Sequence, residues 1–455
     1  MDPTPRTIPH SEPVPGAAPV APVAGDEPDV LVIGGGPAGS TVATLLRRRG
    51  HEVVLIEKDR HPRFHIGESL VPLNLPLFER LGVAAEVEAI GMPKYGAQFV
   101  STTHGKEVMY DFGGALDKRF PLAYQVKRSD LDLILIDNAR RSGAQVLEET
   151  RVGKVEFGAR GERATVTART RDGAERVYRP RFVIDASGRD TLLANQFRIK
   201  ARNPRHASSA LYGHFRGARR LSGREEGNIS VFWFDHGWFW FIPLLDGVTS
   251  VGAVCWPYYL RSRRTDPTTF FLDTIKSCPP LAERLEHATL ERPVTATGNY
   301  SYQCERMYGE GYLMVGDAYA FVDPVFSSGV YLAMYGAFEA ADAVDTILQD
   351  PARQAAVLRR YERTVHRGLR AFTWFVYRMT SPSLRDLFME PRNILRVQEA
   401  MLSLLAGDVF RNRKVPLRIL MFKAFYYGFN IARLRRSLAA WQRRKVQIQT
   451  TPADA

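Results

Sequence analysis

The sequence of 455 residues has few cysteines and no long apolar segment. Its three cysteines (Cys255, Cys278 and Cys304) have an odd count and no metal-ligand spacing, which argues against a disulfide framework or a zinc site. No apolar run approaches the roughly 20 residues that a membrane-spanning helix needs. We therefore expect a globular protein in a reduced, cytoplasmic setting, with no metal site.

The first 28 residues also lack the features of a targeting signal. They are rich in Pro, Ala and Val, and no basic stretch leads into an apolar core. This composition predicts a disordered leader over residues 1–28, and the folded part is expected to begin at Asp29.

Charge is abundant but unevenly placed. The net charge is +13, and residues 351–455 alone carry 21 Lys and Arg against 6 Asp and Glu. One explanation is a solvated basic face on a helical region. The other is contact with an acidic partner, such as a carrier protein or an anionic membrane surface. Nucleic acid is not expected, because no known binding module for it is visible.

The folded part opens with a dinucleotide-binding pattern. An apolar strand at 29–33 precedes a glycine-rich loop, a helical stretch to Arg49, and a second apolar strand at 53–56 that ends in an acid. Such glycines permit a tight turn and close backbone approach to a pyrophosphate at a helix N-terminus, while the acid accepts hydrogen bonds from a ribose. The residues expected to contact the dinucleotide are Gly34, Gly36, Pro37, Ala38, Gly39, Ser40, Glu57 and Lys58.

Two further segments predict that the dinucleotide is FAD. Residues 182–188 form an apolar strand followed by a turn of small residues. Residues 311–317 form another strand that ends at Asp317, ahead of a helical pattern from about 328 to 348. Asp317 is placed to hydrogen-bond ribityl hydroxyls, and the helix N-terminus to face the polar edge of the flavin. No second dinucleotide fingerprint is present, so a separate nicotinamide domain is not expected.

These segments resemble the FAD-binding motifs of the para-hydroxybenzoate hydroxylase-like superfamily. The resemblance implies an α/β fold with a Rossmann-like FAD-binding domain, a β-sheet substrate domain and a helical C-terminal region. It also implies that Arg128, Gly329 and Val330 contact the cofactor. An ordinary arginine at the start of a helix is the alternative for Arg128.

A narrower resemblance is carried by three segments between residues 29 and 348. Residues 64–70 (FHIGESL), the WxWxIP pattern and the FxxPxxSxG pattern together look like those of flavin-dependent halogenases. That resemblance implies that reduced FAD, O2 and chloride or bromide yield hypohalous acid. Reduced FAD would come from a separate flavin reductase, or NAD(P)H would bind transiently. The pattern residues are Trp238, Trp240, Ile242 and Pro243, and then Phe321, Pro324, Ser327 and Gly329.

The halogenase resemblance also implies roles for single residues. Backbone N–H groups of Ser328 and Gly329 would hold the halide. Trp238 and Trp240 would form a wall between flavin and substrate; plain core packing on a strand, which their period-two spacing also predicts, is the alternative, and both can hold together. Lys94 would hold hypohalous acid or form a chloramine on the substrate side, and burial would lower its pKa. The alternative for Lys94 is a surface lysine.

Phe326 departs from the pattern of one halogenase class. Tryptophan halogenases carry a glutamate at this position, before the first serine of the motif, and this chain has Phe326. The departure suggests a phenol or pyrrole substrate, which a carrier protein could deliver.

The expected organisation is a leader, a halogenase core at 29–348 and a basic helical region at 349–455. FAD-binding parts are expected near 29–70, 120–190 and 300–348, with the substrate sheet near 90–120 and 200–300. The C-terminal region is expected to cover the active-site entrance, and it could also lie on a membrane interface. Two other functions stay open: an FAD-dependent aromatic hydroxylase, and a reductase of the geranylgeranyl reductase type.

Overall fold

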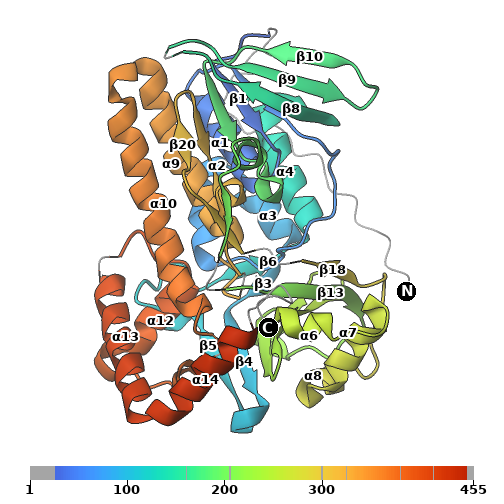
Figure 1. Ribbon diagram of the computed structural model, residues 1–455. Coiled ribbons are helices and arrows are strands. Elements are labelled where there is room, and N and C mark those ends of the chain that lie inside the picture. The colour runs from blue at the N-terminus through green and yellow to red at the C-terminus, as the bar shows by residue number, and fades with distance from the viewer. Residues whose placement is uncertain are drawn as a thin grey trace.

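The computed structural model describes residues 26–447 except 160, 204–205, 299–300, 324, 380 and 413. Most of the predicted leader, and Pro324 of the FxxPxxSxG pattern, therefore lie outside the described residues. Figure 1 shows an α/β half at the top and, below it, a large sheet with helices on either side. The predicted fold class is confirmed.

A six-stranded sheet, in the order β20-β21-β11-β1-β2-β7, forms the centre of the upper half. All neighbouring pairs are parallel except β20 with β21. Every residue of β1, β2 and β11 is buried, as expected for short apolar strands in a covered parallel sheet. The strands are β1 (Val30–Ile33), β2 (Val53–Ile56), β7 (Gln145–Leu147), β11 (Phe182–Asp185), β20 (Tyr308–Gly309) and β21 (Tyr312–Met314).

Helix α1 (Pro37–Arg48) packs between α9 (Gly329–Gln349) and α4 (Arg128–Arg141) on this sheet. A three-stranded sheet of β8 (Thr150–Glu156), β9 (Thr165–Thr170) and β10 (Glu175–Tyr178) adds Val155 and Val166 to the same core. The carboxyl ends of β1, β2 and β11 therefore open at one edge, where ligands bind in doubly wound folds.

The lower half contains an eight-stranded sheet whose main path is β17-β13-β16-β15-β14-β4-β5. On β15, Trp238 and Trp240 face the core that includes the C-terminal helices, while Phe239 and Phe241 face the core under α7. Both faces are thus buried, and the alternation assigns the two tryptophans to one face. The strands are β4 (Gly96–Ser101), β5 (Lys106–Asp111), β13 (Ser209–Arg216), β14 (Ile229–Phe234), β15 (Gly237–Pro243), β16 (Val248–Cys255), β17 (Thr289–Leu290) and β18 (Thr295–Thr297), which pairs with β13.

Smaller elements connect the two halves. β3 (Met92–Lys94) pairs with β6 (Ala123–Gln125), and β19 (Tyr302–Cys304) pairs with β12 (Lys200–Arg202) and β22 (Ala320–Phe321). The short helices are α2 (Leu75–Leu81), α3 (Ala84–Ile90), α5 (Leu192–Gln196), α6 (Pro257–Arg261), α7 (Pro267–Lys276) and α8 (Pro279–Arg284).

The C-terminal region is helical, and it is not a separate unit. Figure 1 shows α10 (Gln354–Val376) running from the upper half to the lower half. Helix α12 (Val397–Leu405) packs on the turn η3 (Phe112–Gly114), and α11 (Pro382–Met389) packs on β4 and β5. Helices α13 (Lys414–Ala432) and α14 (Leu434–Gln447) follow. None of the described helices is both long and apolar enough to cross a membrane.

Candidate active site

A cavity opens at the carboxyl ends of the parallel strands, where ligands bind in doubly wound folds, and residues of both halves of the molecule line it. Gly39 and Ser40 do not line it: a Cβ at Gly39 would lie 1.8 Å from the Gly34 carbonyl oxygen, and Ser40 Oγ donates to the Gly35 carbonyl. The predicted cofactor residues that do line it are Gly34, Gly36, Pro37, Ala38, Glu57, Lys58, Arg128, Asp317, Gly329 and Val330.

The glycine-rich turn has the shape that its sequence requires. Gly34 has φ +102°, and a Cβ there would lie 2.4 Å from the Ala186 carbonyl oxygen, so only glycine fits. The Glu57 carboxylate, at the end of β2, accepts hydrogen bonds from the backbone N–H groups of Gly35 (2.6 Å) and Asp59 (2.9 Å). These bonds hold the acid at the cavity wall with lone pairs still available to a ribose.

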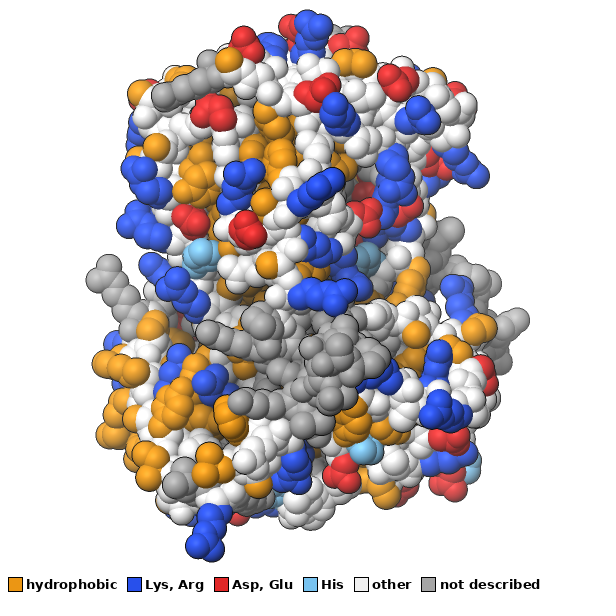
Figure 2. Space-filling model, viewed as in Figure 1, with side chains coloured by type: hydrophobic (Ala, Val, Ile, Leu, Met, Phe, Trp, Pro, Cys, Tyr) orange, Lys and Arg blue, Asp and Glu red, His pale blue; other side chains and the backbone are white. Residues whose placement is uncertain are grey.

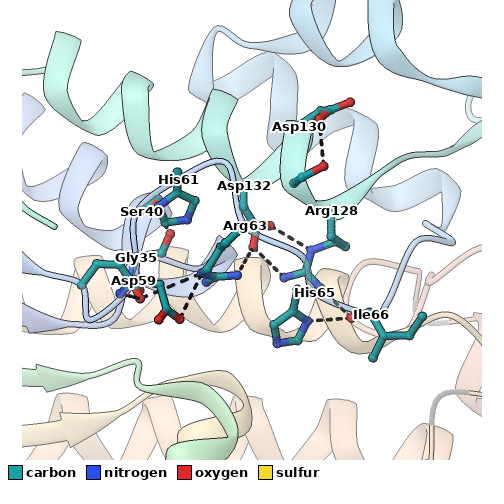
Figure 3. A network of polar contacts seen from close by, with 12 residues as sticks. Gly35, Ser40, Asp59, His61, Arg63, His65, Ile66, Arg128, Asp130 and Asp132 are labelled. Atoms are coloured by element: carbon teal, nitrogen blue, oxygen red, sulfur yellow. Dashed lines mark hydrogen bonds and ion pairs between the residues drawn. The ribbon is translucent and has the colours of Figure 1, made fainter. Parts of the chain in front are cut away.

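A buried charge network lies beside this turn. Figure 3 shows Arg63 between Asp59 and Asp132, with Arg128 on the other side of Asp132. Asp132 receives two hydrogen bonds from Arg128, at 2.8 and 3.0 Å, and one from Arg63 at 3.2 Å. Burial acts to raise the pKa of Asp132, but the charge and hydrogen bonds of Arg128 outweigh it, and the pKa lies below its usual value. The network fixes two guanidinium groups at the cavity wall.

Asp317 faces the cavity from the turn η6 (Gly316–Ala318). Burial raises its pKa to about 6, and the charges of Arg128 and Arg189 offset only part of that effect. A carboxyl group in this state is stabilised by hydroxyl donors. A Cβ at Gly329, the first residue of α9, would meet nothing within 4 Å. A carboxyl group with a raised pKa at the cavity wall and a helix start with open space in front of it fit the ribityl chain and ring of FAD.

The start of α9 presents backbone donors near this space. Ser328 precedes the helix and Gly329 is its first residue. The first N–H groups of a helix have no partner within it, so they are available to an anion. Ser327 has φ +57°, an uncommon conformation for serine. Its Oγ donates to Ser69 Oγ at 2.9 Å.

Lys94 is buried behind this pair of serines. Its Nζ donates to Ser69 Oγ (2.9 Å) and to the Leu70 carbonyl oxygen (2.8 Å), and it lies 5.4 Å from the centre of the Phe112 ring. Burial lowers the pKa of Lys94 to about 7. With 2% of its surface exposed, Lys94 is not the surface lysine that was the alternative. Ser69 and Ser327 line the cavity and Lys94 does not, so Ser69 joins the two.

The two tryptophans form part of the cavity wall. Trp238, Trp240 and Ile242 line the cavity, and Trp240 Nε1 donates to Ser250 Oγ at 3.1 Å. Trp238 also lines a second, small cavity, together with His206, Ser208 and Asp323. Trp238 therefore separates two cavities, and it is also packed in the core.

Of the three remaining motif residues, one lines the cavity and two do not. Phe321 lines the large cavity. Phe326 is buried and packs edge-on against Phe375 of α10, with ring centres 6.2 Å apart. Pro243 ends β15, and neither it nor Phe326 lines the cavity.

Comparison with known proteins agrees with this geometry. Residues 27–375 match the family described as FAD binding domain. The structure of the myxobacterial chondrochloren halogenase is 33% identical, covers 86% of this chain and 92% of its own, and superposes with a TM-score of 0.73. The chain belongs to the flavin-dependent halogenases.

This halogenase also resembles characterised enzymes in sequence. It is 35% identical over 344 residues to a tryptophan 2-halogenase of Chondromyces crocatus, covering 73% of this chain and 64% of that protein. It is 29% identical over 414 residues to a 1H-pyrrole-2-carbonyl-[peptidyl-carrier protein] chlorinase of Pseudomonas fluorescens, covering 86% and 91% respectively. The family match and these relatives establish the fold and the enzyme class of this halogenase, and FAD as its cofactor.

Sequence reasoning missed three residues of this halogenase's site. Asp132 lies four residues after Arg128, and this i, i+4 spacing on a helix was an available signal for the pair. Arg63 lies before, and Ser69 after, a loop with no regular periodicity. Nothing in the local sequence therefore predicts which residues they contact. Ser69 stands within the segment that carried the resemblance, without an assigned role.

Proposed function

We propose that this halogenase makes hypohalous acid and uses Lys94 to direct it onto an electron-rich aromatic ring. Bound reduced FAD would supply two electrons and two protons, which together with O2, a halide ion and one further proton give hypohalous acid and water. The observation that carries the proposal is the chain of contacts Ser327–Ser69–Lys94, which leads from the cavity to a buried amine.

The Lys94 amine is suited to hold the electrophile. With a pKa near 7, about half of the groups carry a free lone pair at neutral pH. The protonated form can donate a hydrogen bond to the oxygen of hypohalous acid. The neutral form can take the halogen as an N-haloamine with loss of water. Attack by a ring carbon then forms the carbon–halogen bond, and the ring proton returns to the lysine nitrogen.

The halide would be held at the start of α9. The N–H groups of Ser328 and Gly329 lie at the N-terminus of α9, a helix of 21 residues. The dipole of such a helix favours an anion at this end. The wall made by Trp238 and Trp240 keeps the substrate away from the ring, which disfavours direct oxygen transfer and therefore the hydroxylase alternative.

The proposed substrate is a phenol or a pyrrole. Phe326 stands where tryptophan halogenases carry a carboxylate, so the ring must supply its own activation. Delivery on a carrier protein is supported by the relative whose name specifies a carrier-bound pyrrole. The relative named for tryptophan makes indole the second candidate.

The first experiment supplies the enzyme with FAD, a flavin reductase, NADH, O2 and either chloride or bromide. Phenols, pyrrole-2-carboxylate and tryptophan are offered free, and the carboxylate also on a carrier protein. We expect halogen isotope patterns in the mass spectra of phenol or pyrrole products. Halogenated tryptophan alone would overturn the substrate proposal. Equal turnover of the free and the carrier-bound carboxylate would show that no carrier protein is needed. A hydroxylated product that forms without halide would overturn the proposed halogenation.

Replacing Ser69 with alanine should uncouple the formation of hypohalous acid from the halogenation of the substrate. Lys94 loses the hydroxyl that joins it to Ser327, so hypohalous acid should escape to a soluble scavenger. We expect about a tenfold lower ratio of halogenated product to NADH consumed, in line with the loss of one hydrogen bond near 1.4 kcal/mol. Ser69→Thr retains a hydroxyl and should restore most of the coupling. Unchanged coupling in Ser69→Ala would show that Ser69 has no part in transfer.

A further inference from the structure

Exposed apolar side chains are concentrated at one place on the molecule. Among the described residues, fourteen large apolar side chains are exposed, and eight of them lie between 417 and 441. Figure 2 shows a cluster of orange side chains at the lower left, where Figure 1 places α13. The eight are Leu417, Leu420, Phe425, Tyr427, Phe429, Ile431, Leu438 and Trp441.

Helix α13 is apolar on two opposite faces. Its inner face is a buried row at i, i+4, i+7 and i+11, formed by Val415, Ile419, Phe422 and Tyr426. Its outer row contains Leu417, Leu420 and Ile431, which are 62%, 63% and 74% exposed. An inner apolar row is sufficient to dock a helix on a core, so the outer row serves another contact.

The same segment has charge of only one sign. Residues 409–453 contain eleven Lys and Arg and no Asp or Glu. The described basic side chains that are exposed here include Lys414, Arg435 and Arg443. An exposed apolar row in a segment that is rich in cations and aromatic side chains is the pattern of helices that lie in a membrane interface.

We propose that the outer face of α13, together with the basic side chains around it, binds the surface of an anionic lipid membrane. Leu417, Leu420 and Ile431 would enter the boundary between headgroups and acyl chains. Lys414, Arg435 and Arg443 would contact lipid phosphates, and α13 would lie parallel to the surface. This inference does not depend on the proposed halogenation.

Two other occupants fit less well. A second copy of the chain would bring the same basic segment against itself, and like charges at an interface oppose association. An acidic carrier protein would have to deliver its cargo to Lys94. The outer row is exposed, and Figure 1 places α13 at the edge of the molecule and β3, which ends at Lys94, near its centre.

The test is flotation of the full chain with two kinds of vesicle. One is made of neutral phosphatidylcholine, and in the other about a quarter of the lipid is replaced by anionic phosphatidylglycerol. We expect binding to the anionic vesicles that falls as salt is raised. Leu417→Ser/Leu420→Ser/Ile431→Ser should reduce it by roughly tenfold or more. Each of Lys414→Gln, Arg435→Gln and Arg443→Gln should reduce it by about fivefold.

The matched control is Leu245→Ser/Leu272→Ser, which removes exposed apolar side chains elsewhere and should leave binding unchanged. All variants change exposed positions, so their thermal unfolding and vesicle-free halogenation should match the parent. Absence of binding to anionic vesicles, equal binding to neutral ones, or a dimer that the triple serine variant dissociates would overturn the inference. Capture of an acidic carrier protein by the same face without vesicle binding would also overturn it.

Discussion

Lys94→Met is expected to abolish halogenation and, at the same time, to stabilise the protein. The amine is the proposed carrier of the electrophile, so its loss should reduce halogenated product by a factor of about 10³ or more while NADH consumption continues. The substituted side chain has a similar length and no charge to bury. We expect the free energy of unfolding to rise by about 1–3 kcal/mol at neutral pH, because burial of the charged amine is costly. The lost bonds to Ser69 Oγ and Leu70 offset part of the gain.

The pH dependence of this gain has a definite sign. In the unfolded chain the amine keeps its ordinary pKa of 10.5, and in the folded protein the pKa is about 7. The folded state therefore binds fewer protons between these values, and the penalty of the buried amine is full below pH 7 and declines as the pH rises towards 10.5. The stability difference between Lys94→Met and the parent should decline in the same window. Halogenation by the parent should rise with pH through about 7.

Urea unfolding at several pH values, with product and NADH measured in parallel, checks both expectations. Lys276→Met is the matched control, because Lys276 is exposed and its replacement should change neither quantity. A Lys94→Met protein that still halogenates would remove Lys94 from the mechanism. A variant that is less stable at neutral pH would show that the hydrogen bonds of the amine outweigh its burial.

Asp132→Asn is expected to be among the most destabilising single changes in the FAD-binding half. It removes the only carboxylate within hydrogen-bond distance of Arg128 among the described residues and leaves Arg63 with carboxylates at 3.9 Å, and breaking a buried pair costs about 3–5 kcal/mol. Because the pKa of Asp132 is lowered, its contribution is present above its ordinary value of 3.8 and is lost only as the pH falls below that value. Both guanidinium groups border the cavity, so FAD affinity should also fall.

Thermal unfolding and FAD titration by fluorescence measure the two effects of Asp132→Asn. Asp130→Asn is the control on the same helix. Among the described residues its carboxylate accepts a side-chain hydrogen bond only from Ser129 Oγ, and the change should cost less than about 0.5 kcal/mol. Equal stability of the two variants would mean that solvent or other groups neutralise the arginines without Asp132.

The parts of the fold set by local spacing could be predicted from the sequence. The strand, turn, helix and strand around Gly34 and Glu57 are encoded within about 30 consecutive residues, as is the strand that leads to Asp317. The contacts Ser327–Ser69 and Arg63–Asp132 join residues that are 258 and 69 positions apart. No periodicity relates such positions, so only the folded chain shows that they meet.

The C-terminal region illustrates a second limit of sequence periodicity. Helical spacing and basic composition are visible from residue 351 onwards. Apolar residues on α13 occur on both sides of the helix, so the pattern does not say which row packs inwards. Aromatic contacts of Phe422 and Tyr426 with Trp374 of α10 decide it.

The path of α10 bears on how enzymes of this kind can be recombined. Leu358 and Tyr361, in its first half, pack in the FAD-binding core, and the Tyr361 hydroxyl donates to the Met314 carbonyl at 2.7 Å. Phe372 and Phe375, in its second half, pack with the tryptophan wall and the C-terminal helices. A chimera joined at residue 349 would exchange a structural part of the cofactor domain along with the C-terminal helices. A junction after Val376 would transplant the later C-terminal helices alone, which makes the end of α10 the natural crossover point between two such enzymes.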